Sequence, residues 1–126
     1  MKKIVISAGK EFTNDEKLVK KILNKLEKIL GLSDKYLEVY LVSDSFMRKN
    51  VLSFEAPKDF PHPETNKFQP LGEIYLNPKY IKENNEDLVY MLVHGLLHLL
   101  GYSHDKESDR MKMEAKEREI VKVLNE

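Results

Sequence analysis

A strongly apolar run in the second half of the chain constrains the fold more than any other feature. Residues 86–100 predict a helix that is buried on most sides, because nearly all of its later side chains are apolar. Two histidines, His94 and His98, interrupt this run, and a third, His104, follows just after Gly101. The fold must therefore enclose a helix that carries imidazoles into the core.

The spacing of these histidines predicts a metal site. Four residues turn a helix by about 400°, so His94 and His98 project from one face about one turn apart. Gly101 can adopt the left-handed conformation that ends a helix, after which the chain can reverse and bring His104 to the same ion. Three imidazoles leave a coordination position open, which is typical of catalytic zinc. We predict one zinc ion per chain, held by His94, His98 and His104.

Two alternatives to catalytic zinc remain at this point. Imidazole ligands also suit iron, nickel or copper, so zinc is the favoured metal rather than the only one. The histidines could instead be core residues with ordinary hydrogen-bond partners, an interpretation that a single histidine in an apolar helix would favour. Three histidines at this spacing, with a glycine at the turn, favour the metal.

Gly95 bears on the chemistry of the site. The spacing of the histidines and Gly101 resembles that of the metzincin zinc proteases. In such proteases, the residue after the first histidine is a glutamate that takes a proton from the zinc-bound water. Gly95 cannot take a proton. The ligand set therefore favours metal-dependent hydrolysis, whereas Gly95 argues against ordinary proteolysis.

The remaining patterns predict a single α/β (α+β) domain over residues 1–126, with a small mixed sheet of about four strands packed with helices. A capping box at residues 13–16 predicts that Thr13 caps a helix and that Glu16 reaches back to it. Gly31 should end that helix. The predicted strands are residues 2–7, 37–42, 51–54 and 71–76. The predicted helices are the one between the Thr13 cap and Gly31, a short piece from Pro78, 86–100 and 106–125.

Composition excludes several classes of protein. The absence of cysteine rules out disulfides, thiolate metal sites and cysteine nucleophiles. The sequence shows neither a signal peptide nor an apolar run long enough to cross a membrane, so we expect a cytoplasmic protein without a membrane partner. The chain has no net charge, although its first 50 residues are basic and the remainder is acidic. A lysine row on the first helix is more typical of a solvated face than of a nucleic-acid contact.

The histidine segment HGLLHLLGYSH (residues 94–104) resembles the H-G-x-L-H-L-x-G-Y-D-H motif of the YbeY-type endoribonucleases, which are bacterial rRNA maturation factors. Residues 50–54, 71–74 and 113–117 resemble further family segments in the same order. The resemblance implies a compact α/β fold, one zinc held by the three histidines and a cytoplasmic location. It also implies a role in maturing the 3′ end of 16S rRNA and in ribosome quality control.

Two departures from the family pattern affect the site. Ser103 replaces the usual aspartate before the third histidine, so the surroundings of His104 carry less charge. A Leu-Asn…Tyr-Arg segment that usually precedes the strand at residues 51–54 is missing, together with the arginine thought to hold the RNA phosphate. Arg48 or Lys49 could replace that charge, and only Arg48 offers a bidentate fork.

We therefore predict a zinc-dependent endoribonuclease directed to single-stranded RNA, with Arg48 and Glu73 as catalytic candidates. Glu73 is expected on a strand that passes under the metal helix. The expected partners are rRNA and ribosomal subunits, and the expected state is a monomer. Further candidates for RNA contact are Lys49, Phe54, Phe60 and Tyr102, and further candidates for proton transfer are Asp105, Glu117 and His62.

Two other functions remain open. One is a zinc peptidase or amidase that takes its base from outside the motif. The other is a ribosome-assembly protein without catalysis, in which zinc only fixes the end of the helix, and the missing arginine segment favours this second alternative.

Overall fold

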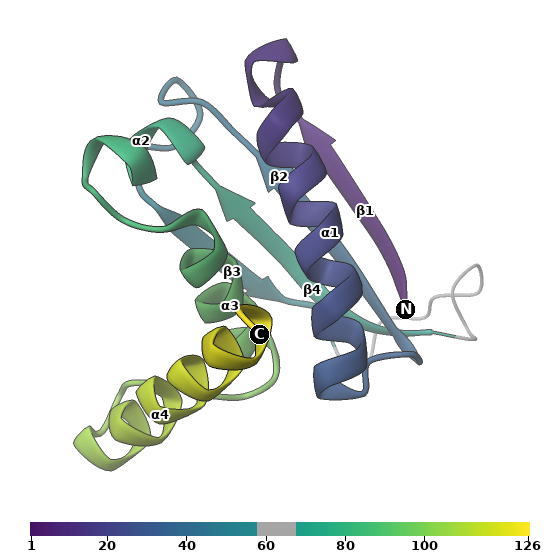
Figure 1. Cartoon of the computed structure of the whole chain (residues 1–126), viewed down its shortest axis with the longest axis vertical. Coiled ribbons are helices and arrows are strands. Elements are labelled where there is room, and N and C mark those ends of the chain that lie inside the picture. The colour runs from purple at the N-terminus through teal and green to yellow at the C-terminus, as the bar shows by residue number, and fades with distance from the viewer. Residues whose placement is uncertain (58–67) are drawn as a thin grey trace.

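The computed structural model of the chain describes residues 1–57 and 68–126. In this part of the chain it has four strands, four α-helices and a short 3-10 turn (Figure 1). In order, the elements are β1 (Lys2–Ser7), the 3-10 turn (Lys10–Phe12), α1 (Thr13–Leu30), β2 (Lys35–Leu41), β3 (Val51–Glu55), β4 (Gln69–Leu76), α2 (Pro78–Glu83), α3 (Leu88–Leu99) and α4 (Glu107–Leu124). All the predicted helices and strands are present, with bounds shifted by a few residues at most.

The strands form one mixed sheet in the order β1-β2-β4-β3. Strands β1, β2 and β4 run parallel, and β3 pairs antiparallel with β4 at the edge. The parallel pairs require crossover connections, and α1 supplies the crossover between β1 and β2. The predicted α/β class with a small mixed sheet is confirmed.

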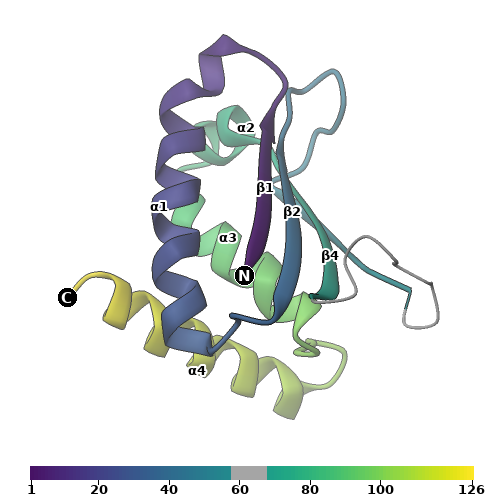
Figure 2. The same cartoon turned by 90° about the vertical axis from the view of Figure 1, so that its right-hand side faces the viewer.

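The helices cover one face of the sheet (Figure 2). Helix α1 contacts β1, and α3 contacts β3 and β4. Alternation along β2 and β4 turns apolar side chains toward the helices and polar or aromatic ones to the other face. The core-facing strand residues that are fully buried include Leu37, Val39, Leu41, Ile74 and Leu76. No helix in the described part of the chain has the length and apolar character needed to span a bilayer.

Helix α3 lies in this core, as the sequence predicted. Leu92, Val93, Leu96 and Leu97 are all at most 1% exposed, so the helix is buried on most of its sides. Its start is fixed by Asp87, whose side chain accepts a hydrogen bond from the backbone N–H of Val89 at 2.8 Å. The polar exceptions on this helix are His94 and His98.

The start of α1 differs from the sequence prediction. Thr13 is the first residue of the helix rather than its cap, and its hydroxyl donates to the backbone oxygen of Lys10 at 2.7 Å. Glu16 does not reach back to Thr13: it accepts a hydrogen bond from Ser7 at 2.8 Å. The capping-box prediction is wrong because the preceding 3-10 turn already supplies the helical entry. The predicted end is confirmed, since Gly31 has a left-handed backbone with φ of 65°.

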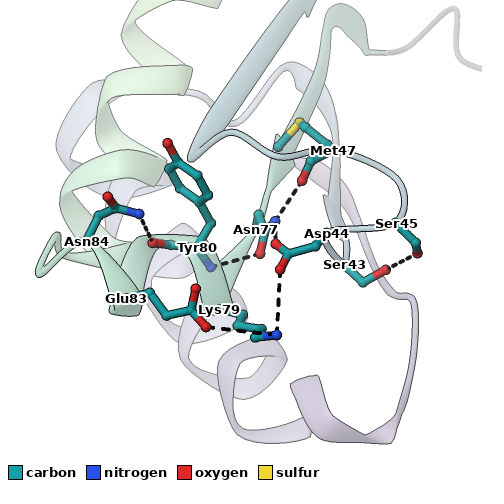
Figure 3. Close-up of polar contacts among 9 residues, drawn as sticks. All are labelled: Ser43, Asp44, Ser45, Met47, Asn77, Lys79, Tyr80, Glu83 and Asn84. Carbon is teal, nitrogen blue, oxygen red and sulfur yellow. Dashed lines mark hydrogen bonds and ion pairs between the residues drawn. The ribbon is translucent and has the colours of Figure 1, made fainter.

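Buried Asn77 connects β4, α2 and the β2–β3 connection (Figure 3). Its amide nitrogen donates to Asp44 at 2.8 Å and to the backbone oxygen of Met47 at 2.7 Å. Its side-chain oxygen accepts from the backbone N–H of Tyr80 at 3.0 Å and so caps α2. Its own N–H donates to the backbone oxygen of Asn50 at 3.1 Å, which holds the start of β3 in place.

Candidate metal centre

Three histidine side chains converge at the C-terminal end of α3. His94 and His98 lie one turn apart on that helix, and their Nε2 atoms are 3.2 Å from each other. Gly101 has a φ of 101°, and the chain beyond it returns so that Nε2 of His104 lies 2.9 Å from that of His98 and 3.4 Å from that of His94. The side chains predicted from their spacing to converge therefore do so, and this cluster could hold a metal ion.

The three nitrogens fit a tetrahedral ion. Two nitrogens bound to zinc at about 2.1 Å with tetrahedral angles lie about 3.4 Å apart. The observed Nε2 separations of 2.9 to 3.4 Å are close to that value. Three nitrogen ligands from the chain leave a coordination position for a substrate atom or a water.

A buried carboxylate fixes the orientation of His94. Oε1 of Glu117 on α4 lies 3.2 Å from Nδ1 of His94, and the Glu117 side chain is only 2% exposed. Tyr90, one turn before His94, hydrogen-bonds to Glu117, and this bond, followed by burial, raises the pKa of Tyr90 to about 12. A carboxylate on Nδ1 leaves Nε2 free to face the ion, which is a common arrangement for histidine ligands.

The surroundings of His98 favour its neutral form. Burial lowers the pKa of His98, and the neighbouring His94 and His104 lower it further, while a hydrogen bond to the backbone of Tyr102 opposes the shift. A histidine must be neutral at the coordinating nitrogen to bind a metal. His98 is therefore suited to act as a ligand.

Gly95 packs tightly between α3 and the sheet. A Cβ atom at this position would lie 3.0 Å from Oγ of Ser53 and 3.1 Å from side-chain carbons of Val51 and Ile74. The Ser53 hydroxyl also donates to the backbone oxygen of Gly95 at 2.9 Å. Position 95 thus faces the sheet, and a glutamate would not fit there without displacing the helix.

The histidines open into a cleft of about 710 Å³ between β3, the end of α3 and α4. Its charged lining residues are Glu55, Asp105, Arg110, Glu114 and Glu117. Sequence reasoning missed Arg110, Glu114, Tyr90 and Ser53. The spacing of the α4 residues could have identified them, because positions 110, 114 and 117 share one face of a helix.

Glu73 lies on the predicted strand, but its side chain lies away from the histidines. Strand β4 does run under α3, but its neighbour Ile74 is the residue that faces the helix at Gly95. Side chains alternate along a strand, so Glu73 points to the opposite face of the sheet. There it accepts a hydrogen bond from the hydroxyl of Tyr75 at 2.8 Å, away from the histidines.

The other candidates for RNA contact are dispersed. Arg48 is exposed and does not line the cleft, and its charge contributes to lowering the pKa of Asp44, behind the larger effect of the Asn77 hydrogen bond. Lys49 lines a separate hollow beside α2. Phe54 stands on the outer face of the sheet, edge-on to Tyr75. Tyr102 and Asp105 do line the cleft, whereas Phe60 and His62 lie outside the described residues.

Comparison with known proteins agrees with this geometry. Residues 5–125 match the family model described as Endoribonuclease YbeY. The chain is 31% identical to Endoribonuclease YbeY of Helicobacter pylori strain J99 over 124 residues, covering 82% of this chain and 81% of that one. It is 34% identical to the same enzyme of Nautilia profundicola, covering 82% and 83% of the two chains.

A solved structure is also similar. The solution structure of a Thermotoga maritima protein superposes with a TM-score of 0.60 and 25% identity, covering 94% of this chain and 86% of the other. The sequence matches and the shared fold place this chain within a known group of proteins. The chain belongs to the Endoribonuclease YbeY family.

Proposed function

We propose that this chain is a zinc-dependent endoribonuclease that cleaves single-stranded RNA during maturation of the 3′ end of 16S rRNA and during ribosome quality control. The observation that carries the proposal is the convergence of the Nε2 atoms of His94, His98 and His104 in the lining of a cleft. Relatives named Endoribonuclease YbeY support an RNA substrate. We further propose a monomer that acts in the cytoplasm on ribosomal subunits.

The side chains around the cleft have different roles in the proposed reaction. The three histidines would hold the ion, and Glu117 with Tyr90 would keep His94 turned toward it. When bound, a zinc ion would supply Lewis-acid polarisation of the phosphodiester and of the attacking water. Among the carboxylates predicted for proton transfer, Glu117 is committed to His94 and Glu73 faces away. Asp105 is exposed in the cleft beside His104, so it is the carboxylate we assign to proton transfer.

Packing at Gly95 weighs against a protease built on this helix. The position where the motif of zinc proteases places its glutamate faces Ser53, Val51 and Ile74 rather than the cleft. A peptidase would need a base from another element. RNA cleavage makes no such demand on position 95.

The test combines metal content with RNA cleavage. Purified protein should carry one zinc per chain and cleave an unstructured RNA faster than a hairpin, and a chelator should abolish cleavage. His98→Ala should lose both the metal and the activity. Retention of stoichiometric metal by His98→Ala would overturn the ligand assignment. Turnover of a peptide with RNA left intact would favour the peptidase, and binding to ribosomal subunits without turnover of RNA or peptide would favour the assembly protein.

A further inference from the structure

Arg110 is a cleft residue on the same face of α4 as the carboxylate that holds His94. Arg110, Glu114 and Glu117 are spaced at i, i+4 and i+7, and all three line the cleft with the histidines. Seven residues of helix place Arg110 about 10 Å along the axis from Glu117. Its long side chain therefore lines the cleft away from the contact between Glu117 and His94.

The charge of the cleft makes Arg110 distinctive. Among the described residues that line it, the fixed charges other than Arg110 are carboxylates, namely Glu55, Asp105, Glu114 and Glu117. An RNA strand brings a negative phosphate at every nucleotide, and carboxylates would repel it. A bound ion at the histidines would offset that repulsion locally. Apart from such an ion, Arg110 supplies the fixed positive charge of the described lining.

The guanidinium of Arg110 is available for a ligand. Its contacts are long ion pairs with Glu107 at 4.0 Å and Glu114 at 3.9 Å, and its side chain is 55% exposed. Both distances exceed those of good charge-assisted hydrogen bonds, and exposed pairs of this kind contribute little. The planar fork of an arginine matches two oxygens of a phosphate group.

We propose that Arg110 binds a backbone phosphate of the RNA strand next to the phosphate that lies at the histidines. The inference rests on the proposed function, because it takes RNA as the ligand of the cleft. It gives Arg110 a role in substrate binding. It also makes Arg110 a determinant of the length of RNA strand that the cleft accepts. An RNA bound this way spans from the histidine cluster to the second turn of α4.

Binding of a labelled single-stranded RNA tests the proposal. Fluorescence anisotropy is read in the first seconds after mixing with zinc-loaded protein, before cleavage products accumulate, at several salt concentrations. Loss of one charged contact should raise the Kd of Arg110→Ala about tenfold. The slope of log affinity against log salt should fall by about 0.7, the value for one phosphate of a single strand. Arg110→Lys should lose less RNA affinity than Arg110→Ala, because lysine keeps the positive charge but lacks the planar fork.

The matched control is Arg118→Ala, which removes the same charge from an exposed position of α4 that does not line the cleft. Its Kd and salt slope should stay within about twofold of the wild type. Metal content and thermal stability should be unchanged in all three variants. In steady-state RNA cleavage, Arg110→Ala should raise KM with little change in kcat, as expected for a contact made equally in the ground and transition states.

The outcomes separate this inference from the proposed function. An altered Kd and salt slope in Arg110→Ala, in a protein that leaves RNA uncut, would support the inference and overturn the proposed catalysis. If the protein cleaves RNA and Arg110→Ala leaves the KM and the salt slope unchanged, the proposed catalysis would be supported and the inference overturned. An equal loss of RNA affinity in Arg118→Ala would overturn the inference, because it would show that the effect comes from the overall charge of the protein. Failure of the wild type to bind RNA would overturn both.

Discussion

Nδ1 of His94 lies 3.2 Å from Oε1 of Glu117, a residue 23 positions further along the chain. This contact joins α3 to α4 and sets the direction in which His94 presents its other nitrogen. The carboxylate is almost completely buried, so water does not compete for it. A histidine cluster that looks local in the sequence thus depends on a second helix for the orientation of His94.

Replacing Glu117 with glutamine should weaken metal binding about 10- to 100-fold, the usual cost of losing a partner of a ligating histidine. The amide keeps the size of the side chain but removes the charge beside Nδ1. Competition with a chromophoric chelator measures the affinity. Glu119→Gln is the control, because Glu119 is 67% exposed on the same helix and pairs with Lys116. Equal affinities for the two variants would contradict the role of Glu117.

Gly95→Ala should destabilise the fold by about 1 kcal/mol. Overpacking against Ser53, Val51 and Ile74 costs about 1–3 kcal/mol, and the better helix propensity of alanine returns about 1 kcal/mol. Val51 and Ile74 are β-branched and cannot easily turn aside. Urea unfolding measures the change, and Val51→Ala in the same chain should reduce the penalty. A more stable Gly95→Ala protein would show that α3 is free to move off the sheet.

Asn77→Ala should cost about 2–3 kcal/mol of unfolding free energy. The change removes the cap of α2 and leaves the backbone oxygen of Met47 without its side-chain donor in a buried environment. Chemical denaturation followed by circular dichroism gives the value. Asn84→Ala removes an exposed hydrogen bond to the backbone of Tyr80 and should cost much less. Similar losses at the two positions would argue against the connecting role of Asn77.

Glu73→Gln should leave metal content and RNA cleavage unchanged, because Glu73 faces away from the histidines. Burial first, and then the Glu73 hydrogen bond, raise the pKa of Tyr75 to about 12. A pKa raised on folding contributes stability that is fully present below about pH 10 and is lost as pH rises toward 12. Absorbance titration of the tyrosines should show a lower pKa for Tyr75 in the variant. Loss of RNA cleavage in Glu73→Gln would contradict this prediction and show that Glu73 takes part in catalysis.

Much of the fold was predictable because its signals are local. The periods of apolar residues placed the helices and strands, and Gly31 and Gly101 marked turns where the backbone takes a positive φ. The capping box failed because the helix entry depends on the turn before it, where Thr13 bonds to Lys10. The direction of the Glu73 side chain was also predictable, because the apolar neighbours of Glu73 indicate which face of β4 is buried.

Sequence alone determined that His94, His98 and His104 could meet, because one helical turn and one reversal of the chain set their relative positions within a short segment. Tertiary structure alone decided what surrounds them. Glu117 and Arg110 reach the cleft only because α4 packs across the end of α3, and Gly95 faces the sheet only because α3 packs tightly on β3 and β4. Local spacing fixes directions within an element, whereas contacts between elements depend on how the whole core is packed.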